Sequence, residues 1–115
     1  MIKPDSLFSI LSDPTRLRAL MLIQSEGEVC VCELTFALKE SQPKISRHLA
    51  LMRDVGIVGS RREGTWMHYR INPLLPEWSK EVIRHVFDQL TGLSPYMEDK
   101  EQLAQMNKRP GKNCA

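Results

Sequence analysis

The chain has 115 residues, of which 42% are hydrophobic, and it carries a formal net charge of +2. This length supports one compact domain and leaves little apolar material for a second core. No uncharged stretch approaches the roughly 18 apolar residues of a membrane span, and the first residues lack the apolar run of an export signal. We therefore expect a cytoplasmic protein that does not enter a membrane.

The positive charge is concentrated in one part of the chain. Residues 39–70 contain seven Lys and Arg residues against three Asp and Glu residues, a net charge of +4, which leaves −2 for the remainder. Such a local excess suits a polyanionic partner that approaches one face. Counting alone also allows an ordinary solvated surface.

Two helices are predicted before residue 40, and a pair of cysteines lies between them. Asp13 precedes a proline, and a capping residue followed by proline at the first helical position is a common helix start. This helix should run to about Gln24. Apolar residues at helical spacing predict a second, shorter helix over residues 33–39. Cys30 and Cys32 lie at its beginning.

A third helix and a β-hairpin follow. In residues 41–56 a serine cap precedes apolar residues at helical spacing and a glycine follows them, which predicts a helix. Residues 57–62 and 65–71 then change to alternating spacing. They predict two strands joined by a tight turn at Glu63 and Gly64.

The last strong pattern is an amphipathic helix of about four turns. Its apolar stripe is broader than a small domain needs, which favours a dimer interface, although packing onto its own domain would also cover it. The stripe consists of Trp78, Val82, Ile83, Val86, Phe87 and Leu90. Beyond Gly92 the sequence becomes polar and shows little periodicity except a weak pattern around Met97 to Met106, so we expect a mobile tail.

The order of these elements matches a winged helix-turn-helix, in which the second helix of the pair enters the DNA major groove. We therefore expect a mainly α (α+β) fold with a two-stranded β wing and a C-terminal dimerisation helix. Residues 1–92 should form this DNA-binding and dimerisation domain. Residues 93–115 should form a polar, mobile C-terminal tail.

Side chains that lie off the buried stripe of the third helix point outward and offer donors to phosphates and base edges. Arg47 and Gln42 are the candidates for base edges, and Lys44 for a phosphate contact. A solvated helix face carries similar residues, but here they coincide with the basic region. His48 is a weaker candidate, because a single histidine is often a boundary residue. The full predicted set is Gln42, Lys44, Ser46, Arg47, His48, Arg61 and Arg62.

Cys30 and Cys32 are the main candidates for chemistry. Thiolates bind soft ions, and a helix N-terminus lowers the pKa of a cysteine, so we expect the reactive form to be favoured here. In a regular helix residues i and i+2 point about 200° apart, so the sulfurs can meet on one ion only if the first turn is irregular. Binding should then pull at the start of the helix. The ordinary alternative is two small buried side chains, which the flanking Glu28 and Glu33 disfavour by suggesting a surface.

Four motifs resemble the ArsR/SmtB family, and specifically its arsenical-resistance operon repressors. They are Glu-Val-Cys-Val-Cys-Glu-Leu at residues 28–34, Ser-Gln-Pro-Lys-Ile-Ser-Arg-His-Leu-Ala-Leu at 41–51, Asp-Pro-Thr-Arg-Leu-Arg at 13–18 and Gly-Thr-Trp-Met-His-Tyr-Arg at 64–70. The similarity spans about residues 7–90. It implies a homodimeric repressor that binds double-stranded operator DNA, requires no cofactor and leaves the DNA when As(III) or Sb(III) binds Cys30 and Cys32.

The chain departs from these repressors at one position. They commonly carry a third cysteine one helical turn after the pair, where this chain has Thr35, whose hydroxyl binds soft ions poorly. Cys114 is a candidate for the third ligand. A solvent oxygen or a small cellular thiol could fill the same position.

Other functions are weighed against this one. A thiolate sensor of the Cd/Pb type and a thiol redox-sensing repressor are alternatives within the family, although a disulfide across one intervening residue is strained. An enzyme is disfavoured, because the sequence has no glycine-rich phosphate loop, no Cys-x-x-Cys and no cluster of His, Asp and Ser suited to catalysis.

Overall fold

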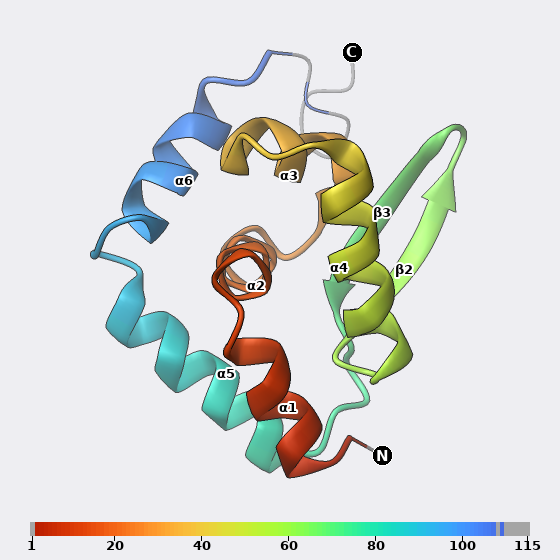
Figure 1. Ribbon diagram of the computed structural model, residues 1–115, viewed down its shortest axis with the longest axis vertical. Helices are drawn as coiled ribbons and strands as arrows, with labels where there is room; N and C mark the ends of the chain where they lie inside the picture. The colour runs from red at the N-terminus through yellow and green to blue at the C-terminus, as the bar shows by residue number, and fades with distance from the viewer. Residues whose placement is uncertain (1, 108, 110–115) are drawn as a thin grey trace.

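A computed structural model describes residues 2–107 and 109 of the chain (Figure 1). This part contains six helices and a three-stranded antiparallel sheet. In chain order the elements are α1 (Pro4–Leu11), α2 (Pro14–Glu26), β1 (Val29–Cys30), α3 (Val31–Leu38), α4 (Gln42–Asp54), β2 (Val58–Glu63), β3 (Trp66–Ile71), α5 (Glu77–Leu90) and α6 (Tyr96–Ala104).

Helix α2 is the centre of the molecule. Figure 1 views it almost end-on, with α1, α5, α6, α3 and α4 placed around it. Five consecutive side chains, residues 19–23, are buried, so this helix has no single apolar face. A helix that is apolar on all sides is one surrounded by other elements. The remaining elements are therefore positioned by their contacts with α2.

The predicted starts of α2 and α4 are confirmed. The Asp13 carboxylate accepts a hydrogen bond from the backbone N–H of Arg16 at 3.0 Å, and Ser41 accepts one from the N–H of Lys44 at 3.4 Å. Both side chains satisfy a donor that the helix leaves without a partner. Gly56 follows α4 with φ +90°, the left-handed conformation that glycine adopts without strain.

The predicted hairpin is present, and a third strand joins it. β2 pairs with β3 from Val58–Ile71 to Glu63–Trp66, and the short β1 pairs with the opposite edge of β3. The sequence predicts two strands only, because the two residues of β1 are too few for a periodic signal. β1 places Cys30 opposite His68, whose side chain is buried.

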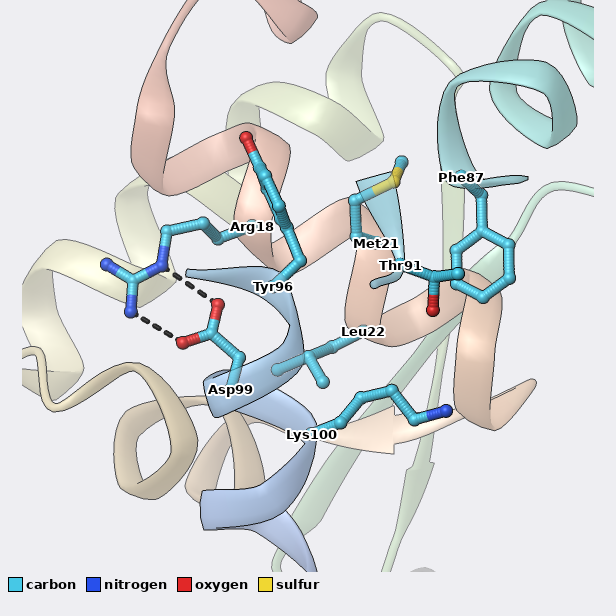
Figure 2. A pocket seen from close by; sticks show the side chains of 8 residues that line it. All are labelled: Arg18, Met21, Leu22, Phe87, Thr91, Tyr96, Asp99 and Lys100. Atoms are coloured by element: carbon cyan, nitrogen blue, oxygen red, sulfur yellow. Dashed lines mark hydrogen bonds and ion pairs between the residues drawn. The ribbon is translucent and has the colours of Figure 1, made fainter. Parts of the chain in front are cut away.

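The expectation of a tail without regular structure from residue 93 is wrong for Tyr96–Ala104, which form α6. Leu103 is buried in the common core, and Asp99 forms a two-bond ion pair with Arg18 of α2, at 2.9 and 2.6 Å (Figure 2). The cavity beside this pair has a volume of about 10 Å³, room for no more than one water molecule. The interface between α2 and α6 is thus closely packed.

An apolar surface remains uncovered on α1 and α5. Phe8 is 55% exposed and Trp78 is 37% exposed, whereas Val82, Val86 and Leu90 are half-buried. Of the residues 77–90 that carry the predicted stripe, only Ser79 and Ile83 are fully buried. Separately, none of the helices in the described part of the chain is both long and apolar enough to cross a membrane.

Candidate functional site

The two cysteine sulfurs lie together at the start of α3. The Cys32 thiol donates to the Cys30 sulfur across 3.1 Å. Cys30 is the N-cap of α3 and has extended backbone angles, φ −86° and ψ 153°. Because Cys30 stands outside the helix, the 200° separation of a regular helix does not apply to this pair. The irregular start that convergence requires is therefore already present without a bound ion.

Glu33 fixes this irregular start. Its Oε1 accepts a hydrogen bond from the backbone N–H of Cys30 at 2.7 Å, in a capping box in which Cys30 takes the usual place of serine or threonine. Glu33 is fully buried and Cys30 is 1% exposed. The interpretation of both flanking glutamates as surface residues is thus wrong for Glu33, since its carboxylate turns inward to cap the helix.

The expected lowering of the thiol pKa is also wrong for Cys32. Burial, reinforced by the hydrogen bond and the charge interaction with Cys30 and then by Glu33, raises the pKa of Cys32 to about 12. The favourable effect of the helix N-terminus is smaller than these contributions. Cys32 therefore rests as a thiol at neutral pH, and a soft ion has to displace its proton.

The cysteines open into a groove of about 450 Å³ that they share with the predicted DNA-reading helix. One wall comes from α3, with Cys30, Cys32 and Thr35, and another comes from Gln42 and Ser46 of α4. The hairpin supplies the remaining wall. Its lining residues are Thr65, Trp66, Met67 and Tyr69. A group bound to the sulfurs would therefore lie between the reading helix and the wing.

No third strong ligand joins the pair in the described part of the chain. Among residues 2–107 and 109, no group of three or more His, Cys, Asp or Glu side chains is placed to hold a metal ion. Thr35 occupies the position one turn later, and its hydroxyl donates to the carbonyl of Cys32 at 2.9 Å. Cys114 lies outside the residues that the structure describes.

Four of the predicted DNA contacts lie along the first two turns of α4 and reach solvent. Gln42 and Arg47 are exposed, whereas Lys44 and Ser46 are half-buried. Ile45 and Leu49 on the opposite side are buried in the core, as the spacing predicted. Lys44 pairs with Glu40 at 3.1 Å. Arg47 forms no ion pair with any residue that the structure describes, so its guanidinium is available.

His48 is placed differently from its neighbours. It turns toward the start of α2, where its Nε2 lies 3.9 Å from Asp13 and its Nδ1 lies 3.5 Å from the Arg16 guanidinium. Burial lowers the pKa of His48, which keeps the ring neutral at pH 7. The structure thus brings His48 into the joint between α2 and α4.

The two wing arginines also differ from each other. Arg61 donates to both carboxylate oxygens of Glu28, at 2.9 and 2.7 Å, and to Glu63 at 2.6 Å. These hydrogen bonds hold the pKa of the Glu28 carboxyl below its usual range. Arg61 therefore ties the wing to the segment before the cysteines. Arg62 is exposed and pairs with no acidic group of the described residues.

Sequence reasoning missed two residues that shape the cysteine site, Glu33 and Arg109. The Cys-x-x-Glu spacing of a capping box could have identified Glu33. Arg109 donates to Glu33 and to Glu26 from 76 and 83 residues further along the chain. No local pattern marks such a contact.

The chain belongs to the ArsR family. The family model described as "Bacterial regulatory protein, arsR family" matches residues 13–60. The chain is 48% identical over 111 residues to the arsenic resistance transcriptional regulator ArsR1 of Pseudomonas putida, covering 96% of this chain and 84% of that protein. It is therefore a helix-turn-helix transcription regulator and not an enzyme.

Two further likenesses support this assignment. The arsenical resistance operon repressor of Escherichia coli is 51% identical over 80 residues, which cover 70% of this chain and 68% of that protein. The crystal structure of the AntR antimony-specific transcriptional repressor superimposes with a TM-score of 0.62 at 27% identity, covering 75% of each chain. The winged helix-turn-helix fold predicted from the sequence is confirmed.

Proposed function

We propose that this chain is a metalloid-responsive repressor that binds operator DNA in the cytoplasm as a homodimer and leaves it when As(III) or Sb(III) binds Cys30 and Cys32. The observation that carries the proposal is the convergence of the two sulfurs, 3.1 Å apart, in the groove that also contains Gln42 and Ser46. The names of the two arsenical-resistance relatives and of the antimony-specific repressor point to the same effector class.

Coupling between the two sites runs through α3. This helix begins at the cysteines and packs against α4, the helix proposed to read the DNA. A bound metalloid has to replace the contact between the sulfurs, and its third substituent has to enter the groove between α4 and the wing. A coupling free energy of about 1 to 3 kcal/mol is sufficient, since it changes DNA affinity about 5- to 150-fold.

The third ligand is proposed to be Cys114. Arg109, five residues earlier, contacts Glu33, and Glu33 contacts the backbone of Cys30. Five extended residues span at most about 17 Å, so covalent geometry allows the Cys114 thiol to reach the Cys30 and Cys32 sulfurs.

Arsenite titrations of the wild type and of Cys114→Ser, followed by sulfur-to-arsenic charge-transfer absorbance, test this ligand. A weaker band and lower affinity are expected for the variant, and equal titrations would remove Cys114 from the site.

The main experiment is a band-shift assay with operator DNA from the upstream region of the gene, performed in excess of a non-thiol reductant. Arsenite should weaken binding by the wild type and leave the Cys30→Ser, Cys32→Ser double variant on the DNA. The reductant removes disulfide formation as a cause of release. Wild-type affinity that is unchanged by arsenite, or an equal loss in the double variant, would contradict the proposal.

The homodimer is proposed on the apolar surface of α1 and α5. Phe8 and Trp78 are partly exposed there, and a domain of this size seldom leaves such a surface uncovered. Phe8→Lys should raise the dimer dissociation constant about tenfold or more in sedimentation equilibrium, because a central aromatic contact contributes about 2 kcal/mol or more. Phe36→Lys, at an exposed phenylalanine on α3, is the matched control. Equal effects of the two substitutions would place the interface elsewhere.

A further inference from the structure

Arg109 lies against the start of the cysteine-bearing helix. Its side chain is 12% exposed and sits between two carboxylates, with Nε 2.5 Å from Glu33 Oε2 and Nη2 2.9 Å from Glu26 Oε1. Glu26 ends α2 and Glu33 belongs to the first turn of α3. The Arg109 guanidinium therefore bridges the junction between these two helices.

The same contact continues to the sulfurs. Arg109 holds one oxygen of Glu33, and the other oxygen holds the backbone N–H of Cys30. Cys30 keeps extended backbone angles as the N-cap, and this conformation brings its sulfur within 3.1 Å of Cys32. Arg109, Glu33 and Cys30 thus form a continuous series of hydrogen bonds from the C-terminal segment to the thiol pair.

Charge makes Arg109 necessary for this arrangement. Glu33 is fully buried, and Arg109 is its only cationic partner among residues 2–107 and 109. An ionised carboxylate that is buried without a cation is strongly unfavourable, so the protein relaxes by exposing or neutralising it. Exposing the carboxylate would release the Cys30 N–H.

We propose that Arg109 is a positioning residue for the thiol pair: by compensating the buried charge of Glu33, it keeps the start of α3 in the conformation that binds a metalloid. This inference rests on the proposed function, which it extends by making metalloid affinity depend on a residue of the C-terminal segment. Residues that hold a metal ligand in place through one intermediate group typically change metal affinity by about 10- to 100-fold when they are removed.

Four full-length proteins test the proposal: wild type, Arg109→Ala, Arg109→Ala/Glu33→Gln and Arg18→Ala. Arsenite affinity is measured from the sulfur-to-arsenic charge-transfer band, with circular dichroism to verify folding. Arg109→Ala should lower the affinity about 10- to 100-fold. Adding Glu33→Gln should restore most of it, because a neutral glutamine still accepts the Cys30 N–H without a buried charge. Arg18→Ala breaks the comparable pair with Asp99 and should leave arsenite affinity near the wild-type value.

Wild-type affinity in Arg109→Ala, an equal loss in Arg18→Ala, or no recovery in the double variant would each overturn the proposal. Amide hydrogen exchange at Cys30, measured without arsenite, separates this inference from the proposed function. Exchange should be faster in Arg109→Ala than in the wild type and slow again in the double variant. If the wild type failed to bind arsenite, the proposed function would be contradicted. Unchanged amide hydrogen exchange at Cys30 in Arg109→Ala would contradict only the positioning role of Arg109.

Discussion

Cys30 performs two tasks that are usually given to different residues. It is the N-cap of α3, where serine or threonine is the common choice, and it supplies one of the two sulfurs. The cap position gives the residue extended backbone angles, which a position inside the helix does not allow. The spacing of one residue between the thiols works here because only Cys32 belongs to the helix. Replacing Cys30 by serine would keep the cap and remove the ligand.

The raised pKa of Cys32 leads to a prediction about its reactivity. A thiol with a pKa of about 12 gains thiolate tenfold for each pH unit throughout the range accessible to a folded protein. The rate of alkylation of Cys32 by iodoacetamide should therefore rise about tenfold per unit from pH 6 to 9 without levelling. Site-resolved mass spectrometry measures this rate. A plateau near pH 8.5, the ordinary thiol value, would show that burial does not control the residue.

At this scale the sequence predicted that the two candidate thiols could converge, but it did not predict the environment of the pair. The Cys-x-Cys spacing identified Cys30 and Cys32, and their convergence agrees with the irregular start that the helical period demanded. The expected reactive thiolate was wrong for Cys32, because burial of its sulfur and the buried Glu33 beside it depend on tertiary packing. Local sequence cannot reveal how much water a neighbouring segment excludes.

Helix α4 and the β2–β3 hairpin form the face that is proposed to contact DNA. Within α4 the side chains differ in their freedom. Arg47 is exposed, Lys44 is partly held by Glu40, and His48 is turned toward α2. These differences indicate that Arg47 is the residue best able to reach a base edge, where a guanidinium forms paired hydrogen bonds with guanine.

The corresponding prediction compares two substitutions in α4. Arg47→Ala should weaken operator binding by about 1 to 3 kcal/mol and weaken random DNA less. Lys44→Ala should weaken both alike and reduce the slope of log affinity against log salt by about 1. Fluorescence anisotropy over a range of salt concentrations measures both effects. Equal losses on operator and random DNA for Arg47→Ala would assign Arg47 to phosphate contacts.

Some helices and strands could be predicted from the sequence pattern and others could not. Caps and helical spacing placed α2 and α4, and alternation around Gly64 placed the hairpin. α6 was missed because its association depends on one buried leucine, Leu103, and on the ion pair of Asp99 with Arg18, 81 residues apart. A polar helix that is held by long-range contacts has only a weak amphipathic pattern, such as the one around Met97 to Met106.

The whole molecule is organised around α2, and two ion pairs attach later parts of the chain to its neighbourhood. Arg18 of α2 holds α6 through Asp99, and Arg109 bridges the end of α2 and the start of α3. The sequence predicted the central helix but not these attachments, because the acidic and basic partners are distant in the chain. Charged residues such as Arg18 and Arg109, which a sequence alone would place on the surface, therefore attach α6 and residue 109 to the rest of the domain.

The ion pair between Arg18 and Asp99 should respond asymmetrically to substitution. The Asp99 side chain is 4% exposed and that of Arg18 is 24% exposed. Arg18→Ala leaves a buried carboxylate without a cation and should cost about 3 to 5 kcal/mol of unfolding free energy. Asp99→Ala leaves an arginine that reaches water and should cost clearly less. Urea denaturation of both variants measures the difference. Equal costs would mean that Asp99 is more hydrated than its burial indicates.

The groove bounded by α3, α4 and the wing has a consequence for evolution and for engineering. Gln42 and Ser46 line the same groove as Cys30 and Cys32, so under the proposed function this one groove would meet both a nucleotide sequence and an inducer. Retargeting such a protein to a new promoter by exchanging these two positions would also alter its dose response to the toxic element. Biosensor designs on this scaffold should keep both positions and vary Arg47 instead.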